Sequence, residues 1–262
     1  MKRVYDYLAT CGLLAILAGL ILVWTILALV LLGPLPRRWR WAAARYTMMA
    51  GFRFFAGALS AAGACELDLQ AIDTLRNGPP LILAPNHPSS MDAILFLSRH
   101  PNLVCILKPE LMRNVFLGAG ARLAGFIRSH PPRHMVKEAV AELRRGGQIL
   151  LFPEGTRTLR APINPLTGSA GVIARHAGVS IQVVLIETDS PYLGKGWPLF
   201  RVPRLPIRYR VRLGRLLEPG DDPAACMAAL ERELTRELAA APQNGWLGGG
   251  SASGGKALLD GR

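Results

Sequence analysis

The chain has few cysteines, and their spacing argues against two common kinds of stabilised site. It has four in 262 residues, and none forms a Cys-x-x-Cys pair. The pattern therefore indicates neither a zinc site nor a disulfide framework. No Gly-x-Ser-x-Gly sequence occurs either, so the nucleophile elbow of serine hydrolases is missing. We expect reduced structural thiols beside the cytoplasm, no metal and no resident cofactor. The cysteines are Cys11, Cys65, Cys105 and Cys226.

Acidic residues are also scarce. The 31 lysines and arginines outnumber the 18 aspartates and glutamates, which gives a net charge of +13. Such a surplus predicts an anionic partner. The chain carries no nucleic-acid-binding motif and no basic low-complexity tail. An anionic membrane surface is therefore favoured over nucleic acid.

One long stretch near the N-terminus lacks charge altogether. Leu8–Leu32 is 25 residues long, and as a helix it would reach about 37 Å, enough for a hydrocarbon core of about 30 Å. It exceeds the apolar core of a signal peptide. Arginines after the run predict a catalytic domain on the cytoplasmic side if the run spans the membrane. Glycines within it, and Gly33-Pro34 after it, leave a monotopic helix or a re-entrant hairpin open.

Aromatic residues alternate with arginines just beyond this run. Trp39, Trp41 and Tyr46 fit a helix lying at the level of lipid headgroups. Phe52–Phe55 fits that interpretation and an ordinary core helix equally well.

A tract of polar residues, Asn86 to Asp92, follows a short apolar run. The run Leu81–Ala84 predicts a buried strand, and Asp92–Leu97 predicts a helix with a serine as its N-cap. His87 would then lie in the turn, where Asp92 can bind one ring nitrogen and leave the other as a base near neutral pH. The same spacing also fits a capping box beside an exposed histidine. The tract alone leaves both interpretations open.

A second tract, Phe152-Pro153-Glu154-Gly155-Thr156-Arg157, ends the predicted strand Gly147–Phe152. Its glycine allows close approach to the backbone, and the guanidinium of Arg157 suits a phosphate. A turn with a solvated ion pair is the alternative for either residue singly. The whole ordered string favours a functional site.

Together the two tracts resemble the first and third conserved blocks of the glycerolipid acyltransferases, the family of the 1-acylglycerol-3-phosphate acyltransferases. In the first block a His and an Asp are separated by four residues, as His87 and Asp92 are. The third block, Phe-Pro-Glu-Gly-Thr-Arg, is matched without a gap by residues 152–157. The resemblance extends from Leu81 to Ile186. It implies an α/β fold with a mixed sheet flanked by helices.

The resemblance also implies a mechanism. His87 would deprotonate the hydroxyl of a lysolipid, which attacks the thioester of acyl-CoA or acyl-carrier protein, and Asp92 would orient His87. The residues implied to bind substrate are Glu154, Gly155, Thr156 and Arg157 at the head group. Either Lys108 or a backbone N–H near the first block would face the oxyanion.

Two further family blocks match less closely. Gly125-Phe126-Ile127 fits the second block, whose arginine is either Arg128 or Arg133. Residues 179–185 occupy the place of the fourth block but lack its prolines. These blocks help to bind the acceptor and the acyl chain, so the chemistry is better specified than the acceptor.

The remaining elements follow from periodicity and breakers. We expect helices near 135–145, 167–176 and 223–240, strands at 180–186 and 207–213, and a loop at 190–202 that is either a lid or a surface connection. The alternating strand 207–213 carries three arginines on a solvated edge or a membrane-facing stripe. His130 and His134 are predicted to lie in a loop, because Pro131-Pro132 separates them.

The predicted arrangement is a membrane anchor and interfacial helix (1–62), an acyltransferase domain (63–241) and a tail expected to be disordered (242–262). The predicted activity is acylation of lysophosphatidic acid at the cytoplasmic face of a membrane. Acylation of another lysolipid, such as a lyso-aminolipid, is the nearest alternative. A catalytically silent scaffold that binds lipid headgroups is the alternative of a different class.

Overall fold

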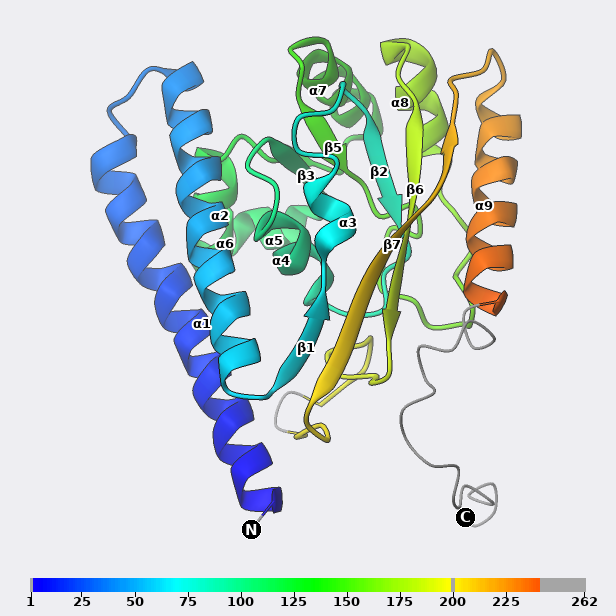
Figure 1. Cartoon of the computed structure of the whole chain (residues 1–262). Coiled ribbons are helices and arrows are strands. Elements are labelled where there is room, and N and C mark those ends of the chain that lie inside the picture. Colours follow the sequence, from blue (N-terminus) through cyan, green and yellow to red (C-terminus); the bar gives the residue numbers. More distant parts are fainter. Residues whose placement is uncertain (1, 199–200, 241–262) are drawn as a thin grey trace.

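A computed structural model describes residues 2–198 and 201–240. It contains a seven-stranded mixed sheet preceded by two long antiparallel helices (Figure 1). This confirms the predicted α/β class. The predicted tail at 242–262 lies outside the described residues.

The strands are β1 (Cys65–Asp68), β2 (Ile82–Pro85), β3 (Leu103–Leu107), β4 (Ile127–Arg128), β5 (Gln148–Leu150), β6 (Ile181–Thr188) and β7 (Ile207–Leu217). The helices are α1 (Lys2–Leu32), α2 (Arg37–Ala61), α3 (Gln70–Asp73), α4 (Asp92–Leu97), α5 (Pro109–Arg113), α6 (Val115–Leu123), α7 (Pro132–Arg144), α8 (Ser169–Ala177) and α9 (Pro223–Ala240).

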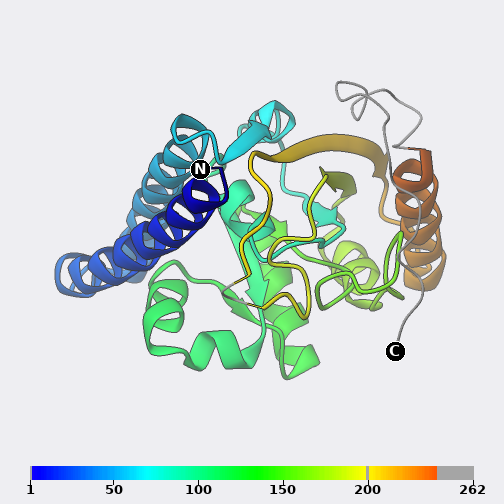
Figure 2. The same ribbon diagram turned by 90° about the horizontal axis from the view of Figure 1, so that it is seen from below.

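The strand order is β1-β7-β6-β2-β5-β3-β4, and the central strands are parallel. Every residue of β2 is buried, which explains its continuous apolar sequence: parallel strands are covered on both faces. Helices α1, α2 and α4 lie on one side of the sheet and α7, α8 and α9 on the other (Figures 1 and 2). The carboxyl ends of β2, β5, β3 and β4 therefore meet at one edge, where the two motif tracts lie.

Among the described residues, α1 is the one helix long and apolar enough to cross a membrane. It packs against α2 and α6 along one side. Its other side is apolar and exposed; Val30, for example, is 67% exposed. In α2, Trp39 is exposed, as an interfacial helix requires, whereas Phe55 is buried in the core and Phe54 is exposed. The core alternative thus holds for Phe55 and in part for Phe52, which is half-buried and packs against the core, but not for Phe54.

A buried ion pair joins α2 to the sheet domain. Arg45 Nη1 lies 2.6 Å from Glu142 Oε1 in α7, and Arg45 Nε donates to the carbonyl oxygen of Ala124 at 2.8 Å. Burial opposes ionisation of Glu142, but Arg45 and Arg145 more than offset it and lower its pKa. Arg37, Arg45 and Arg145 also surround the ring of Trp41. Trp41 is therefore held between α2 and α7.

Two predictions about local structure are wrong. Pro132 begins α7, so His134 lies in a helix and pairs with Glu138 at 3.3 Å; proline is well tolerated in a first helical turn because its missing N–H needs no partner there. The predicted serine N-cap of α4 is also not observed, because Met91 holds that position.

The sequence suggested that the arginines of β7 lie on a solvated edge of the sheet, but β7 is not an edge strand. It lies between β1 and β6, and its three arginines are paired with carboxylates. Arg208 pairs with Glu66, and Arg210 with Asp68, both on β1. Arg212 pairs with Glu187 on β6. The stripe is a cross-strand ion-pair ladder rather than a free cationic face.

The Arg45–Glu142 pair gives a stability prediction. Arg45→Met should lower the free energy of unfolding by about 3 kcal/mol, because it leaves a buried carboxylate with Arg145 alone. Adding Glu142→Met should recover part of the loss, since apolar side chains then replace both charges. Arg53→Met, at an exposed position of the same helix, is the control. Chemical denaturation of the three variants measures the differences.

The stability difference should also depend on pH. Because the folded-state pKa of Glu142 is lowered, its stabilisation is present above the ordinary glutamate pKa of about 4.3 and is lost as the pH falls through the folded pKa. The gap between the wild type and Arg45→Met should therefore shrink in acid. A gap independent of pH would contradict this account.

Candidate active site

The turn after β2 is fixed by an asparagine. Pro85 ends β2, where it is still paired with Val184 of β6. The side chain of Asn86 continues the contact with β6: Nδ2 donates to the carbonyl oxygen of Ile186 at 2.9 Å, and Oδ1 accepts from its N–H at 2.7 Å. This clamp sets the direction in which the chain leaves the sheet, and His87 follows at once.

His87 and Asp92 meet as predicted. His87 Nδ1 lies 2.8 Å from Asp92 Oδ2, and the same oxygen accepts the N–H of Ser89 at 2.9 Å. The second bond resembles one half of a capping box, but Met91 rather than Ser89 is the N-cap of α4, and His87 is bound to Asp92 rather than freely exposed. Because a carboxylate accepts, Nδ1 carries the proton and Nε2 is left as the basic nitrogen. No partner of Nε2 is found among the described residues.

The surroundings of the pair suit a base. Asp92 is fully buried, whereas the side chain of His87 is 17% exposed. Burial raises the pKa of Asp92, and the hydrogen bonds from His87 and Ser89 oppose that rise. The ring of His87 stacks on Phe152 with centroids 3.8 Å apart. The stacking and the carboxylate together restrict the ring to one orientation.

Glu154 connects the two tracts. Its Oε1 accepts the N–H of His87 at 3.0 Å and the hydroxyl of Thr158 at 2.7 Å. Its Oε2 accepts the N–H of Asn164 at 2.8 Å. The side chain is buried, and its hydrogen bonds are directed at the protein. The observed contacts of Glu154 are those of a brace beneath the histidine.

Other residues in and just after the second tract fix the backbone around His87 and Glu154. The N–H of Thr158 donates to the carbonyl oxygen of His87 at 2.8 Å. Gly155 has φ of +64° and lies next to Thr167, a backbone conformation that favours glycine. Thr156 is half-buried. Asn164, which the sequence did not single out, binds the N–H of Leu159 and of Arg160.

Arg157 faces the loop after β6. Its Nη1 donates to the carbonyl oxygens of Leu193 and Gly194 at 2.8 and 3.0 Å. In the same loop, the carbonyl oxygen of Tyr192 accepts a hydrogen bond from the hydroxyl of Ser89 at 2.9 Å. In Figure 2, which looks onto this edge, the loop passes across the ends of the strands. Residues 190–198 are therefore part of the site.

The other predicted cations lie farther along the edge. Lys108 follows β3, Arg128 ends β4, and Arg133 lies in the first turn of α7. All three are exposed. The structure brings His87, Asp92, Glu154 and Arg157 together in one cluster and leaves these three outside it.

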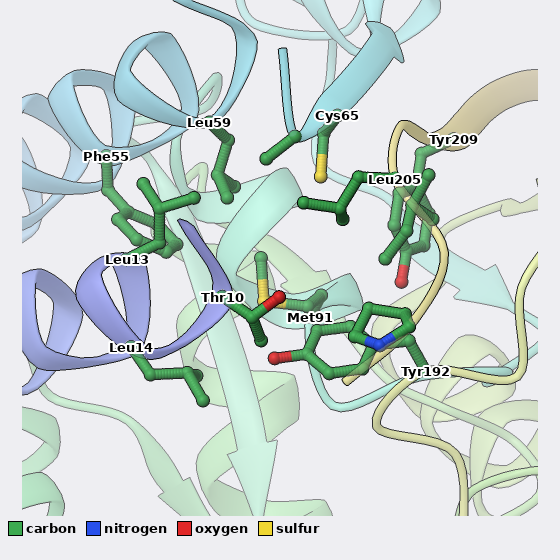
Figure 3. A pocket seen from close by; sticks show the side chains of 13 residues that line it. Thr10, Leu13, Leu14, Phe55, Leu59, Cys65, Met91, Tyr192, Leu205 and Tyr209 are labelled. Atoms are coloured by element: carbon green, nitrogen blue, oxygen red, sulfur yellow. The ribbon is translucent and has the colours of Figure 1, made fainter. Parts of the chain in front are cut away.

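An apolar seam reaches the site from the N-terminal helices. A cavity of about 30 Å³ lies where α1, α2 and β1 meet the turn before α4 (Figure 3). Its walls include Leu13 from α1, Phe55 from α2, and Met91 beside Asp92. The hydroxyl of Thr10, which is buried, also faces this seam and has no partner among the described residues.

The arrangement of these residues is suited to general-base chemistry. A histidine oriented by a buried carboxylate can take the proton of a bound hydroxyl. Within residues 2–198 and 201–240, no group of three or more His, Cys, Asp or Glu side chains could hold a metal ion.

Comparison with known proteins finds a matching family model and several similar enzymes. The Acyltransferase family model matches residues 66–187. The chain is 23% identical to a 1-acyl-sn-glycerol-3-phosphate acyltransferase of Pseudomonas aeruginosa over 67% of this chain and 69% of that protein. It is 28% identical to a lyso-ornithine lipid O-acyltransferase of the same organism over 61% of this chain and 66% of that protein. Residues 66–187 thus match the Acyltransferase family model, and the chain is similar to acyltransferases that act on lysolipids.

A solved structure shares the fold. The 1-acyl-sn-glycerophosphate acyltransferase PlsC of Thermotoga maritima matches with a TM-score of 0.68 at 20% identity, covering 92% of this chain and 98% of that one. Across the curated relatives, the chain spans between 37% and 69% of the relative's length.

Sequence reasoning on this acyltransferase missed Asn86, Asn164 and Tyr209. Asn86 adjoins the histidine, so its position was a usable signal. Tyr209 is fully buried in β7, and neither its hydroxyl nor Asp92 Oδ1 has a partner among the described residues. Burial, followed by the nearby charge of Asp92, raises the pKa of Tyr209. Nothing local in its strand pattern marked it as a neighbour of the site.

The brace gives a test. Glu154→Gln places an amide N–H opposite the N–H of Asn164, and a buried donor left unpaired costs about 1–3 kcal/mol. We expect a lower melting temperature, faster amide exchange in residues 157–164 and a reduced kcat. Glu231→Gln, an exposed glutamate on α9, is the control. A raised acceptor KM with unchanged exchange would instead assign Glu154 to the head group.

Proposed function

We propose that the protein transfers a fatty acyl group from a thioester donor to the hydroxyl of a lysolipid. Nε2 of His87 takes the hydroxyl proton while the oxygen attacks the thioester carbon. The tetrahedral intermediate collapses with cleavage of the C–S bond, and the proton on His87 passes to the departing thiolate. The observation that carries the proposal is the 2.8 Å contact between His87 and a fully buried Asp92.

The acceptor proposed first is lysophosphatidic acid, giving phosphatidic acid. Arg157 supports it: its neighbour Thr158 binds the backbone of His87, and no carboxylate lies within ion-pair distance of Arg157 among the described residues. A guanidinium that lies near the base and has no carboxylate partner suits an anionic head group. Thr156 and Gly155 adjoin it. Glu154 serves this site by holding His87 rather than by touching the acceptor.

A second acceptor is favoured by one observation. The relative with the higher identity, 28%, is named a lyso-ornithine lipid O-acyltransferase. A lyso-aminolipid lacks the phosphate that Arg157 would bind. Acceptor preference therefore separates the two candidates directly. A silent scaffold has less support, since the dyad and its brace are complete.

The exposed side of α1 supports membrane attachment. It is apolar from Leu8 to Leu32, while the other side of α1 packs on α2 and α6. Because α2 is charged and bound to the domain, a hairpin lying along the membrane surface fits these contacts better than a single span. The cytoplasmic side is proposed because the flanking arginines would be attracted to the anionic lipids of the cytoplasmic leaflet. The apolar seam at Leu13 and Met91 is where an acyl chain would approach, after α1 shifts to enlarge it.

Activity is tested by thiol release in membranes. The wild type should release thiol from acyl-CoA or acyl-carrier protein when a lysolipid is present, and His87→Ala should reduce turnover by a factor of roughly 10²–10⁴. Asp92→Asn should cost nearly as much, because it disturbs the tautomer. His176→Ala, an exposed histidine of α8, is the control. A folded His87→Ala protein with wild-type turnover would refute the mechanism.

The same assay with several acceptors decides between the candidates. We expect lysophosphatidic acid to be used with the highest kcat/KM. Use of a lyso-ornithine lipid alone would replace the first candidate with the second. Release with neither acceptor, despite intact folding, would favour the scaffold.

Membrane attachment is tested by extraction. The full chain should stay with membranes in high salt, because apolar burial is not screened as surface charge is. Deleting residues 1–34 should leave a weaker attachment through Trp39 and the arginines of α2, and that attachment should be salt-sensitive. A full-length chain that washes off in high salt would show that α1 does not bury its exposed side in lipid.

A further inference from the structure

A second cavity lies at the far end of the same sheet edge. It measures about 450 Å³ and is formed by the start of α5, the end of β4 and the entry to α7. Proline rings make rigid walls, and two arginines and a histidine supply the polar groups. The lining residues are Pro109, Arg113, Arg128, His130, Pro131 and Pro132.

The arginines of this cavity are not neutralised. Among the described residues, no carboxylate lies within ion-pair distance of Arg128. Arg113 reaches only Glu110, at 3.6 Å, and both side chains are more than two-thirds exposed. Exposed pairs of this kind contribute little. The cavity therefore presents positive charge that is available to an anion.

The strand register fixes how far this cavity lies from His87. Leu83 of β2, Leu150 of β5 and Cys105 of β3 stand in one row. Leu107 and Arg128 pair two residues farther on, so Arg128 is level with Pro85. Three strand spacings separate Pro85 from Arg128, or about 14 Å at about 4.8 Å each.

That distance excludes the acceptor phosphate as the occupant. In a lysophosphatidic acid the reacting hydroxyl and the phosphorus are about 5 Å apart, given bonds of about 1.5 Å. A phosphate on an acceptor whose hydroxyl meets His87 would lie near Arg157, not at β4. The side chain of Arg128 lines the distant cavity and so faces a different group.

The donor has an anion at the required distance. Acyl-CoA and acyl-carrier protein both hold the thioester on a phosphopantetheine arm. The arm has about thirteen bonds between sulfur and phosphorus, which span about 15 Å when extended, at about 3.4 Å for every three bonds of an extended chain. With the thioester at His87, this arm reaches the β4 end of the edge.

We propose that this cavity binds the phosphate of the donor's phosphopantetheine arm, with Arg128 and Arg113 as the cations. The proposal rests on the proposed acyl transfer. It gives the second-block arginine a role toward the donor rather than the acceptor, and it leaves the acceptor phosphate to Arg157.

Kinetics with matched donors test the assignment. Arg128→Gln should raise the KM of palmitoyl-CoA, palmitoyl-phosphopantetheine and palmitoyl-carrier protein about tenfold or more, the loss expected for a charge-assisted hydrogen bond. The KM of palmitoyl-pantetheine, which lacks the phosphate, and that of the lysolipid should stay unchanged. Arg157→Gln should show the reverse pattern with lysophosphatidic acid. Arg215→Gln, exposed at the opposite end of the sheet, is the control for lost charge.

Three results would overturn the proposal. A higher KM for the lysolipid with unchanged donor values would make the cavity an acceptor site. An equal rise for palmitoyl-pantetheine would remove the phosphate from the explanation. A rise with palmitoyl-CoA alone would place the nucleotide phosphates, not the shared phosphate, in the cavity.

Binding without turnover separates this proposal from the activity itself. Desulfo-CoA, which cannot carry an acyl group, should bind the full-length wild type and Arg215→Gln alike and Arg128→Gln about tenfold more weakly. A wild type that binds desulfo-CoA in this way but transfers no acyl group would refute the proposed function and keep the site. Active protein whose affinity is unchanged by Arg128→Gln would refute the site alone.

Discussion

The buried carboxylate of Glu154 is the contact on which the site depends. A carboxylate removed from water must have its oxygens satisfied by donors, and here the donors come from His87, Thr158 and Asn164. Satisfying one charge therefore fixes three segments at once. If the turn that carries His87 moved away, Glu154 Oε1 would lose one of its two donors and keep only the hydroxyl of Thr158. The burial of Glu154 therefore favours a rigid turn beneath the base.

The same logic recurs on a larger scale between α2 and α7. Arg45 and Glu142 are buried together, and their pairing holds the N-terminal hairpin against the sheet. The orientation of α1 follows, because α1 packs on α2 and α6. An apolar helix surface thus has a set position relative to His87. If that surface enters lipid, the buried pair of Arg45 and Glu142 brings the base to the headgroup level, although both residues are distant from His87 in sequence.

Local turn chemistry made much of this predictable. Strand β2, helix α4 and the meeting of His87 with Asp92 all depend on residues close in sequence, whose types restrict the backbone directly. Pro132 shows the limit of that reasoning: proline separates elements in many contexts, but at a helix start it loses nothing, and α7 begins there.

Longer-range features were less accessible. Asn86 binds Ile186, one hundred residues away, and the partner could not be read from either segment. Strand β1 was missed because it is short and carries two carboxylates, Glu66 and Asp68. Their presence in a strand is explained only by their ion pairs with the arginines of β7. Glu154 was expected at the head group because its residue type suits that role, but residue type does not fix the direction of a side chain. In the structure the carboxylate of Glu154 is buried and points toward the backbone N–H groups of His87 and Asn164.

If the protein binds a thioester donor as proposed, the strand order would let one sheet edge accommodate the two ends of that donor, which differ in chemistry. On the β7 side of His87, the seam at Met91 and Leu13 is apolar and continues to the N-terminal hairpin. On the β4 side, the cavity at Arg128 is cationic and open. An acyl chain is more stable in apolar surroundings, and a phosphate is stabilised by cations. Only one orientation of the proposed donor would therefore place both of its ends favourably. That orientation puts the thioester between them, at the strand that carries His87, and the order of parallel strands becomes a determinant of how the donor lies.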